Sequence, residues 1–223
     1  MTSEVLRSAG AHVLVDDLDA PVLADAELHH VFRVLRVRPG ETVTVTDGGG
    51  RWRACRATDG AIEPTGEVHR AARRDLPITV AFSIPKHDRP EWIVQKLTEL
   101  GVDRIVLLHA ERSGVRWDGD RAERHLVKLR RVASEALQQS RGVWLPEVTG
   151  PVPATEVLPN AAAAEPGAPP LGSEHTVVAV GPEGGWSPAE LAAAATTVSI
   201  GSTVLRVETA AIVAAARMLM HTE

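Results

Sequence analysis

The sequence predicts an α/β protein in which a small β-barrel is followed by a mainly parallel sheet with helices on both faces. Residues 1–70 read as short strands separated by turns, whereas from Leu76 onward strand-like runs alternate with helical runs. Near the C-terminus, two glycine-containing loops each connect an apolar strand to a helix, as at the ligand-binding edge of open α/β sheets. We expect the two domains to cover residues 1–72 and 76–223.

Composition indicates a globular protein without a membrane segment. The chain has 223 residues, of which 44% are hydrophobic and 24% charged, as is ordinary for a soluble domain. Its first residues lack the apolar stretch of a signal peptide, and no apolar run approaches the roughly 20 residues of a membrane-spanning helix. The single cysteine, Cys55, excludes an intrachain disulfide and a cysteine-based metal cluster. We expect a cytoplasmic location.

The charges are distributed unevenly along the chain. The net charge of −5 argues mildly against nucleic acid as a partner. However, residues 112–142 carry eight Lys or Arg against four Asp or Glu, whereas residues 143–223 carry two against eight. Because local basic patches govern phosphate binding, the basic stretch suits an RNA contact or, equally, a solvated helix face.

The first domain is predicted from alternation and turn residues. Residues 41–46 alternate polar and apolar side chains, and the turn Asp47–Gly50 leads from them into a second strand at 51–57. These strands fit a small barrel better than an open sheet. The remaining signals are a strand at 12–15, one short helix at about 25–34 and a linker at 70–75.

The second domain is predicted from alternating strand and helix signals. Pro90 and Glu91 open a helix that stops at Gly101, since proline and acidic residues suit a first turn and glycine suits a C-cap. A long helix at about 120–140 has an apolar stripe made by Leu126, Leu129, Ala133, Ala136 and Leu137. The other strands and a final helix are expected at 78–83, 104–108, 161–164, 176–180, 198–200 and 208–221.

The two C-terminal loops predict a cofactor pocket made from backbone. One runs from Gly181 to Gly185 and the other begins at Gly201, each directly after a strand. A single such glycine is usually an ordinary turn residue, but without Cβ atoms two neighbouring loops let a ligand approach the main chain. No P-loop or Gly-x-Gly-x-x-Gly pattern follows a strand, which disfavours a nucleotide-phosphate enzyme.

Several short segments follow one another in a specific order and spacing along nearly the whole chain. They are His29–Arg36 with Pro39–Glu41, Lys86 with Asp88–Arg89, Gln95–Lys96 with Glu99–Val102, Glu111–Ser113, Glu135–Ser140, Gly181–Gly185, and Val204–Arg206 with Glu208–Ala210. Together these segments closely resemble the SPOUT methyltransferases, and specifically the RsmE family. The resemblance implies a PUA-like barrel and a SPOUT domain whose C-terminal segment forms a deep trefoil knot.

The resemblance also implies an activity. Members of this family use S-adenosyl-L-methionine to methylate N3 of a uridine in 16S ribosomal RNA, and they work as homodimers. We expect the assembled small ribosomal subunit to be the substrate. By position, the adenosyl group would be held by loops near 165–171, 180–185 and 200–205. The cofactor-binding residues implied are Val180, Gly181, Pro182, Glu183, Gly184, Gly185, Ile200, Gly201, Val204, Leu205 and Thr209.

Three side chains are candidates for the chemistry. Arg206 and Arg112 suit stabilisation of negative charge on the uracil oxygens, and Glu183 is the candidate proton acceptor. Helix capping and loop shaping are the structural alternatives for these positions. The arginines expected to contact RNA are Arg33, Arg36, Arg38, Arg51, Arg53 and Arg141. The resemblance also implies an arginine shortly after Gln139–Ser140, where this chain reads Arg141-Gly142-Val143. Either Arg141 takes over that role, or a basic RNA contact is missing at Gly142.

The sequence also offers other candidate residues and alternative functions. His29 and His30 have no companion ligands at metal-binding spacing, so we expect no metal. Trp52 could stack on an unpaired base, and Trp186 could touch either ligand. The alternatives are a SPOUT-fold RNA-binding or assembly factor without turnover, and a SPOUT enzyme acting on another RNA atom.

Overall fold

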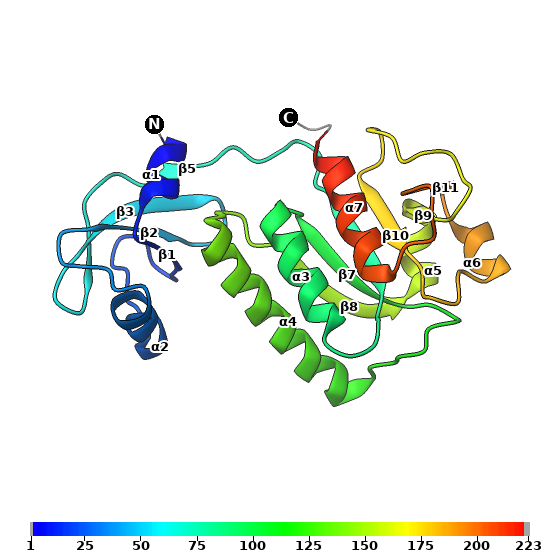
Figure 1. Ribbon diagram of the computed structural model, residues 1–223, viewed down its shortest axis with the longest axis horizontal. Helices are drawn as coiled ribbons and strands as arrows, with labels where there is room; N and C mark the ends of the chain where they lie inside the picture. The colour runs from blue at the N-terminus through cyan, green and yellow to red at the C-terminus, as the bar shows by residue number, and fades with distance from the viewer. Residues whose placement is uncertain (1, 221–223) are drawn as a thin grey trace. The chain divides into compact units, whose positions relative to one another are not determined.

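The computed structural model describes residues 2–220, and the side chains from residue 4 onward. The described chain forms two compact units (Figure 1). The first extends to Arg73 and also includes residues 134–145, and the second comprises residues 74–133 and the chain from Pro146 onward. None of the described helices is long and apolar enough to cross a membrane.

The first unit is built on a five-stranded sheet. Its strands run in the order β1-β2-β3-β4, with β5 pairing with β3. The predicted strands and the predicted hairpin turn are confirmed, and the short helix is present as two consecutive segments. The elements are α1 (Thr2–Ser8), β1 (Ala11–Leu14), α2 (Asp25–His29), the π-helical turn η1 (His30–Val34), β2 (Thr42–Thr46), β3 (Arg51–Ala57), β4 (Ile62–Pro64) and β5 (His69–Arg70).

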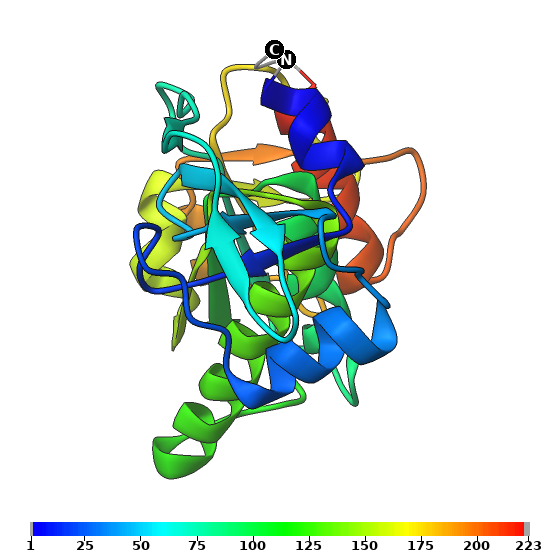
Figure 2. The ribbon, with the colours of Figure 1, turned by 90° about the vertical axis from the view of Figure 1, so that its left-hand side faces the viewer.

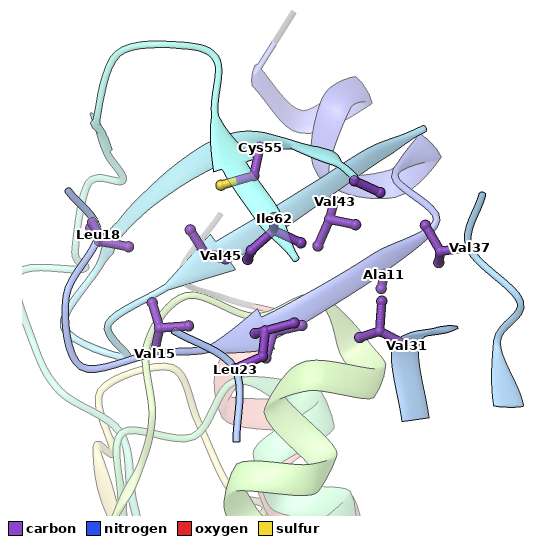
Figure 3. Packing of buried hydrophobic residues seen from close by; sticks show 12 residues of the cluster. Ala11, Val15, Leu18, Leu23, Val31, Val37, Val43, Val45, Cys55 and Ile62 are labelled. Atoms are coloured by element: carbon purple, nitrogen blue, oxygen red, sulfur yellow. The ribbon is translucent and has the colours of Figure 1, made fainter. Parts of the chain in front are cut away.

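An aliphatic core lies against one face of this sheet. Val43 and Val45 of β2 point into it, and Val31 and Val37 close it from the α2–η1 side (Figure 3). The opposite face of β2 is also covered, although strict alternation predicts a solvated face. Thr44 and Thr46 are both fully buried, and their hydroxyls bond to His12 and to the Arg51 carbonyl. This burial with hydrogen bonds explains why threonine occupies both positions.

The second unit has a six-stranded, wholly parallel sheet in the order β11-β9-β10-β6-β7-β8, which confirms the predicted parallel sheet. Its elements are β6 (Thr79–Ser83), α3 (Arg89–Leu100), β7 (Arg104–His109), α4 (Gly119–Ser140), β8 (Glu147–Pro153), α5 (Ala154–Val157), the 3-10 helix η2 (Leu158–Asn160), β9 (Ala162–Ala164), β10 (Val177–Val180), α6 (Pro188–Ala193), β11 (Thr196–Val198) and α7 (Val207–Leu219).

Helices cover both faces of this sheet. Helices α3 and α7 pack against one another and lie in front of the sheet in Figure 1. On the other face, Ala81, Ala163 and Ala179 form a core cluster with residues of α5, η2 and α6. Because neighbouring strand residues alternate between faces, small alanines allow the short helices to approach closely while Val80 and Phe82 pack on the opposite side.

The element boundaries correct the sequence prediction in a few places. The strand predicted at 198–200 ends at Val198, and the final helix begins one residue early and ends at Leu219. Its predicted end, His221, lies outside the described residues. The short elements α1, α5 and α6 and the strand β8 were not predicted. Helix α3 ends as predicted, with Gly101 at φ +82° in the left-handed conformation.

Candidate functional site

A cavity opens where three adjacent strands of the parallel sheet end. The lining residues come from the ends of β9 and β10, from the segments that follow β9, β10 and β11, and from the start of α7. All but two of the predicted cofactor-binding residues are among them. The cavity is lined by Ala164, Glu165, Pro166, Val180, Gly181, Pro182, Glu183, Gly185, Trp186, Ile200, Gly201, Thr203, Val204, Leu205, Val207 and Ala210. Gly184 and Thr209 do not line it.

Gly181 and Trp186 form one wall of this cavity. A Cβ atom added at Gly181 would come within 2.8 Å of the Trp186 ring, so only glycine fits without displacing the indole. The ring is buried, and its Nε1–H donates to the Ala164 carbonyl at 3.1 Å. This bond ties the loop after β10 to the end of β9. The sequence leaves open whether Trp186 touches the cofactor or the RNA; in the structure its ring lines this cavity.

The glycine-rich loop is fastened by side chains from neighbouring elements. Arg89, the first residue of α3, places Nη1 3.2 Å from Glu183 Oε1. Arg112 donates from Nη1 to the Gly184 carbonyl at 3.3 Å. Beyond the loop, Ser187 and Glu190 cap α6 reciprocally, and the Glu190 carboxylate also accepts from the Glu111 amide at 2.8 Å. The loop is therefore anchored at several points.

Arg89 also reaches the start of the last helix. Its Nε lies 3.5 Å from Oε1 of Glu208, in the first turn of α7. The Glu208 carboxylate is largely buried, and its Oε2 has no hydrogen-bond partner among the described residues. The Arg89 guanidinium thus bridges two carboxylates that belong to the two segments bordering the cavity. Sequence reasoning missed this bridge because the three residues are far apart in the chain.

The candidate catalytic groups differ in how they are held. Glu183 lines the cavity and is paired with Arg89, with about half of its side chain exposed. Arg112 lies against the same loop through its bond to Gly184. Arg206 is the N-cap residue of α7 and is exposed, with no side-chain capping bond. These three side chains border the loops that form the cavity, and Thr209 is exposed one turn further along α7.

The five predicted RNA-contacting arginines between residues 33 and 53 fall into two groups. Arg33, Arg36 and Arg38 are exposed and form no ion pair with the residues that the structure describes. Arg51 and Arg53 each form an ion pair within the same unit, Arg51 with Asp47 at 2.7 Å and Arg53 with Asp19 at 2.9 Å. An arginine that already has a carboxylate partner is a weaker candidate for a phosphate contact, because that partner must be displaced.

Arg141 and Gly142 end helix α4 in a Schellman motif. Arg141 has a left-handed φ of +59°, its amide donates to the Gln138 carbonyl, and the Gly142 amide donates to the Leu137 carbonyl. The Arg141 guanidinium donates to the Leu6 carbonyl at 3.0 Å. A Cβ at Gly142 would lie 2.7 Å from a methyl of the buried Leu137. Packing against Leu137 therefore explains why a glycine occupies position 142, where this chain departs from the family pattern.

His12 is buried beside this motif. Its Nε2 lies 2.8 Å from the Gly142 carbonyl and its Nδ1 2.8 Å from the Thr44 hydroxyl. Because a carbonyl can only accept, Nε2 carries the proton and Nδ1 accepts from Thr44. Burial, opposed by the bond to Gly142 and aided by the Arg141 charge, lowers the pKa of His12 to about 4. The imidazole is neutral at physiological pH.

Two further features concern Trp52 and the residues that could bind a metal ion. The idea that Trp52 stacks on RNA is wrong, because its side chain is 2% exposed and packs against the His69 ring. Within residues 2–220, no group of three or more His, Cys, Asp or Glu side chains is arranged to hold a metal ion.

Comparison with known proteins places the chain among RNA-modifying enzymes. Residues 72–219 match the RNA methyltransferase domain family, and residues 23–59 match the RNA methyltransferase PUA domain. Ribosomal RNA small subunit methyltransferase E of Mycobacterium bovis is 33% identical, with 89% of this chain and 86% of that protein covered. The Synechocystis protein of the same name is 32% identical, with 88% and 71% covered.

A solved structure is similar over its whole length. The Neisseria gonorrhoeae ribosomal RNA small subunit methyltransferase E, crystallised with bound S-adenosyl methionine, superposes with a TM-score of 0.79. It is 27% identical, with 94% of this chain and 97% of that chain covered. The similarity therefore includes both units of the chain.

Proposed function

Since the chain belongs to the ribosomal RNA small subunit methyltransferase E family, we propose that it methylates N3 of a uridine in 16S ribosomal RNA, using S-adenosyl-L-methionine. The observation that carries this proposal is the glycine-lined cavity at the carboxyl ends of β9, β10 and β11. Parallel α/β sheets bind their ligands at this edge. The family that the sequence resembles is thus the same enzyme class as that of the relatives found by comparison.

The residues present fit the adenosyl group of this cofactor. The walls are mainly aliphatic, from Val180, Ile200 and Leu205, and main chain is accessible at Gly181 and Gly201. Apolar walls with a few backbone polar groups are what a bound nucleoside requires. When bound, S-adenosyl-L-methionine supplies an electrophilic methyl group on its sulfonium sulfur.

In the proposed reaction, uracil N3 attacks that methyl carbon, the new N–C bond forms as the S–C bond breaks, and the N3 proton leaves. Glu183 is the proposed acceptor of this proton. Arg206 and Arg112 would stabilise the negative charge that spreads to O2 and O4 of the uracil. Because N3 lies on the Watson–Crick edge, the target base must be unpaired or flipped out of its stack.

The proposed trefoil knot is supported by the path of the chain after β11. The segment from Ser199 runs beside the loop before β10, where the Ser199 amide donates to the Pro169 carbonyl and the Leu171 amide donates to the Ser199 carbonyl. The chain then leaves the sheet edge and α7 packs on α3, β6 and β10, nearer the middle of the sheet. Closure of the first unit into a PUA-like barrel is part of the same proposal.

A homodimer is also part of the proposal. Trp92 and Leu100 of α3 are 45% and 38% exposed, and Met220 after α7 is 78% exposed. Exposed large apolar side chains on or next to two helices that pack together suit a protein interface. Light scattering on Trp92→Glu would report a monomer if these helices form the interface, and an unchanged dimer would contradict this. Because ribosomal subunits are the proposed substrate, a cytoplasmic location follows.

Methyl transfer can be tested directly with labelled cofactor. Small ribosomal subunits and naked 16S RNA, both from cells lacking the modification, would be incubated with S-adenosyl-L-methionine carrying a radioactive methyl group. We expect label to enter the RNA of the subunits, and more slowly the naked RNA. Cofactor binding without incorporation into either substrate would contradict the proposal and favour an assembly factor.

A further inference from the structure

A second cavity lies within the first unit. Figures 1 and 2 both place the α2–η1 helix below the sheet of this unit, and the cavity lies against that helix. It measures about 450 Å³ and is open to solvent on one side. Its walls are the helix, Pro39 before β2, and the turn between β3 and β4. The lining residues are Leu28, His29, Phe32, Arg33, Pro39, Thr58, Asp59 and Gly60.

The floor of this cavity is apolar and held firmly. Leu28 and Phe32 lie four residues apart, so they share a helix face, and both pack against the core of the unit while lining the cavity. Val31 and Val37 anchor the same segment in the core (Figure 3). The Phe32 ring is therefore held in place at the bottom of an accessible cavity, a geometry suited to a flat apolar group.

The rim is cationic on the helix side. His29 and Arg33 line the cavity four residues apart and are exposed. Arg36 and Arg38, which are also exposed, come next along the chain but do not line the cavity. None of these arginines forms an ion pair with a described residue, in contrast to Arg51 and Arg53 of the same unit. Arg36 has a left-handed φ of +57°, and the segment before it is a π-helical turn. Such irregular backbone is found often at functional sites.

The opposite wall offers hydrogen-bond acceptors. Thr58 and Asp59 lie in the turn between β3 and β4, which is closed by the bond from the Thr58 amide to the Ala61 carbonyl. Their side-chain oxygens can accept from base N–H groups, whereas a phosphate would be repelled by the Asp59 carboxylate. A ligand with one anionic end and one flat, hydrogen-donating end matches both walls.

We propose that this cavity receives one unpaired nucleotide of the RNA substrate. Its base would stack on Phe32 and donate to Thr58 or Asp59, and its phosphate would pair with Arg33, with Arg36 and Arg38 following the adjoining backbone. Unpaired bases are recognised in this way, by aromatic stacking and by arginine at the phosphates. The inference rests on the proposed function, in that the ligand is RNA, and it adds a nucleotide-binding site in the first unit.

The test compares Phe32→Leu and Arg33→Gln with the unmodified enzyme. Leucine keeps the apolar floor but removes the ring, and the matched control Arg7→Gln removes an exposed arginine from α1 of the same unit. The probes are a fluorescent 12-nucleotide uridine strand and an RNA duplex of the same length. We expect the two cavity variants to bind the single strand at least about fivefold more weakly. Arg7→Gln should bind as the unmodified enzyme does.

Further readouts separate this site from the rest of the protein. Affinity for S-adenosyl-L-methionine should be unchanged in both cavity variants, and cross-linking of 4-thiouridine RNA to the unmodified enzyme should label residues 28–33. The proposal is overturned if the variants bind the single strand normally, or if Phe32→Leu weakens duplex and single strand equally. If the two variants bind RNA normally but no longer methylate small subunits, the cavity would instead contact a ribosomal protein. Failure of the unmodified enzyme to methylate at all would count against the proposed function and not against this site.

Discussion

The guanidinium of Arg89 lies 3.2 Å from the carboxylate of Glu183 and, through Nε, 3.5 Å from that of Glu208. One side chain on α3 therefore links the glycine-rich loop after β10 to the first turn of α7. Since both segments border the cavity, the bridge sets the spacing between two of its walls.

We predict that Arg89→Ala weakens cofactor binding by about 5- to 30-fold, because the partly exposed Glu183 loses its anchor and the buried Glu208 carboxylate loses its cation. Arg89→Lys should recover part of the affinity. Isothermal titration with S-adenosyl-L-methionine measures both. Arg104→Gln, which removes an exposed arginine paired with Glu147, serves as the control and should bind normally. Equal affinities for Arg89→Ala and the control would show that the bridge does not organise the cavity.

Gly181→Ala should reduce cofactor affinity more than tenfold without unfolding the protein. The added methyl would lie 2.8 Å from the Trp186 ring, so the indole must move, and it forms a wall of the cavity. Gly114→Ala is the matched control, because its methyl would meet only Lys86 at an ordinary 3.6 Å. Tryptophan fluorescence with and without cofactor follows the displaced ring. Normal affinity in Gly181→Ala would mean that this wall is not used.

Stability should fall steeply in mild acid because of His12. Its pKa is about 4 in the folded protein and near 6.5 when unfolded, so between these values the unfolded chain binds more protons. The contribution of His12 is complete above pH 6.5 and is lost as pH falls toward 4, amounting to about 3 kcal/mol. Urea unfolding at several pH values, compared with His12→Gln, isolates this contribution. Parallel pH profiles for the two proteins would contradict the assignment.

Gly142→Ala should destabilise the protein by about 1–3 kcal/mol, because the new methyl presses on the buried Leu137 side chain. Gly66→Ala in the same unit, with only Ala54 at 4.0 Å, should be nearly neutral. Thermal unfolding of the two variants gives the comparison. A neutral Gly142→Ala would leave this glycine without a packing role and make Gly142→Arg a reasonable way to look for a missing RNA contact.

The sequence predicts the strongly patterned elements well and the short helices poorly, for a physical reason. The strand at Thr79–Ser83 and helix α4 repeat their apolar pattern over enough residues to be recognised. Helices α5 and α6, with four and six residues, are too short to show a helical period, and they form because they cover the alanine face of the sheet.

The sequence likewise predicts some features of the candidate site and not others. Both glycine-containing loops could be read from the sequence, because each follows a strand and precedes a helix. The pairing of Arg89 with Glu183 could not, since the two residues are 94 positions apart. The partners of Arg53 and the burial of Trp52 were hidden for the same reason, because each depends on which distant segments fold together.

The most direct test of the central claim is nucleoside mass spectrometry of 16S RNA from small subunits that lack the modification, after incubation with the enzyme and S-adenosyl-L-methionine. Gly181→Ala provides the matched sample with an impaired cavity. We predict one new N3-methyluridine, formed far more slowly by the variant. A 2′-O-methyl nucleoside, another methylated base, or no product despite bound cofactor would contradict the account.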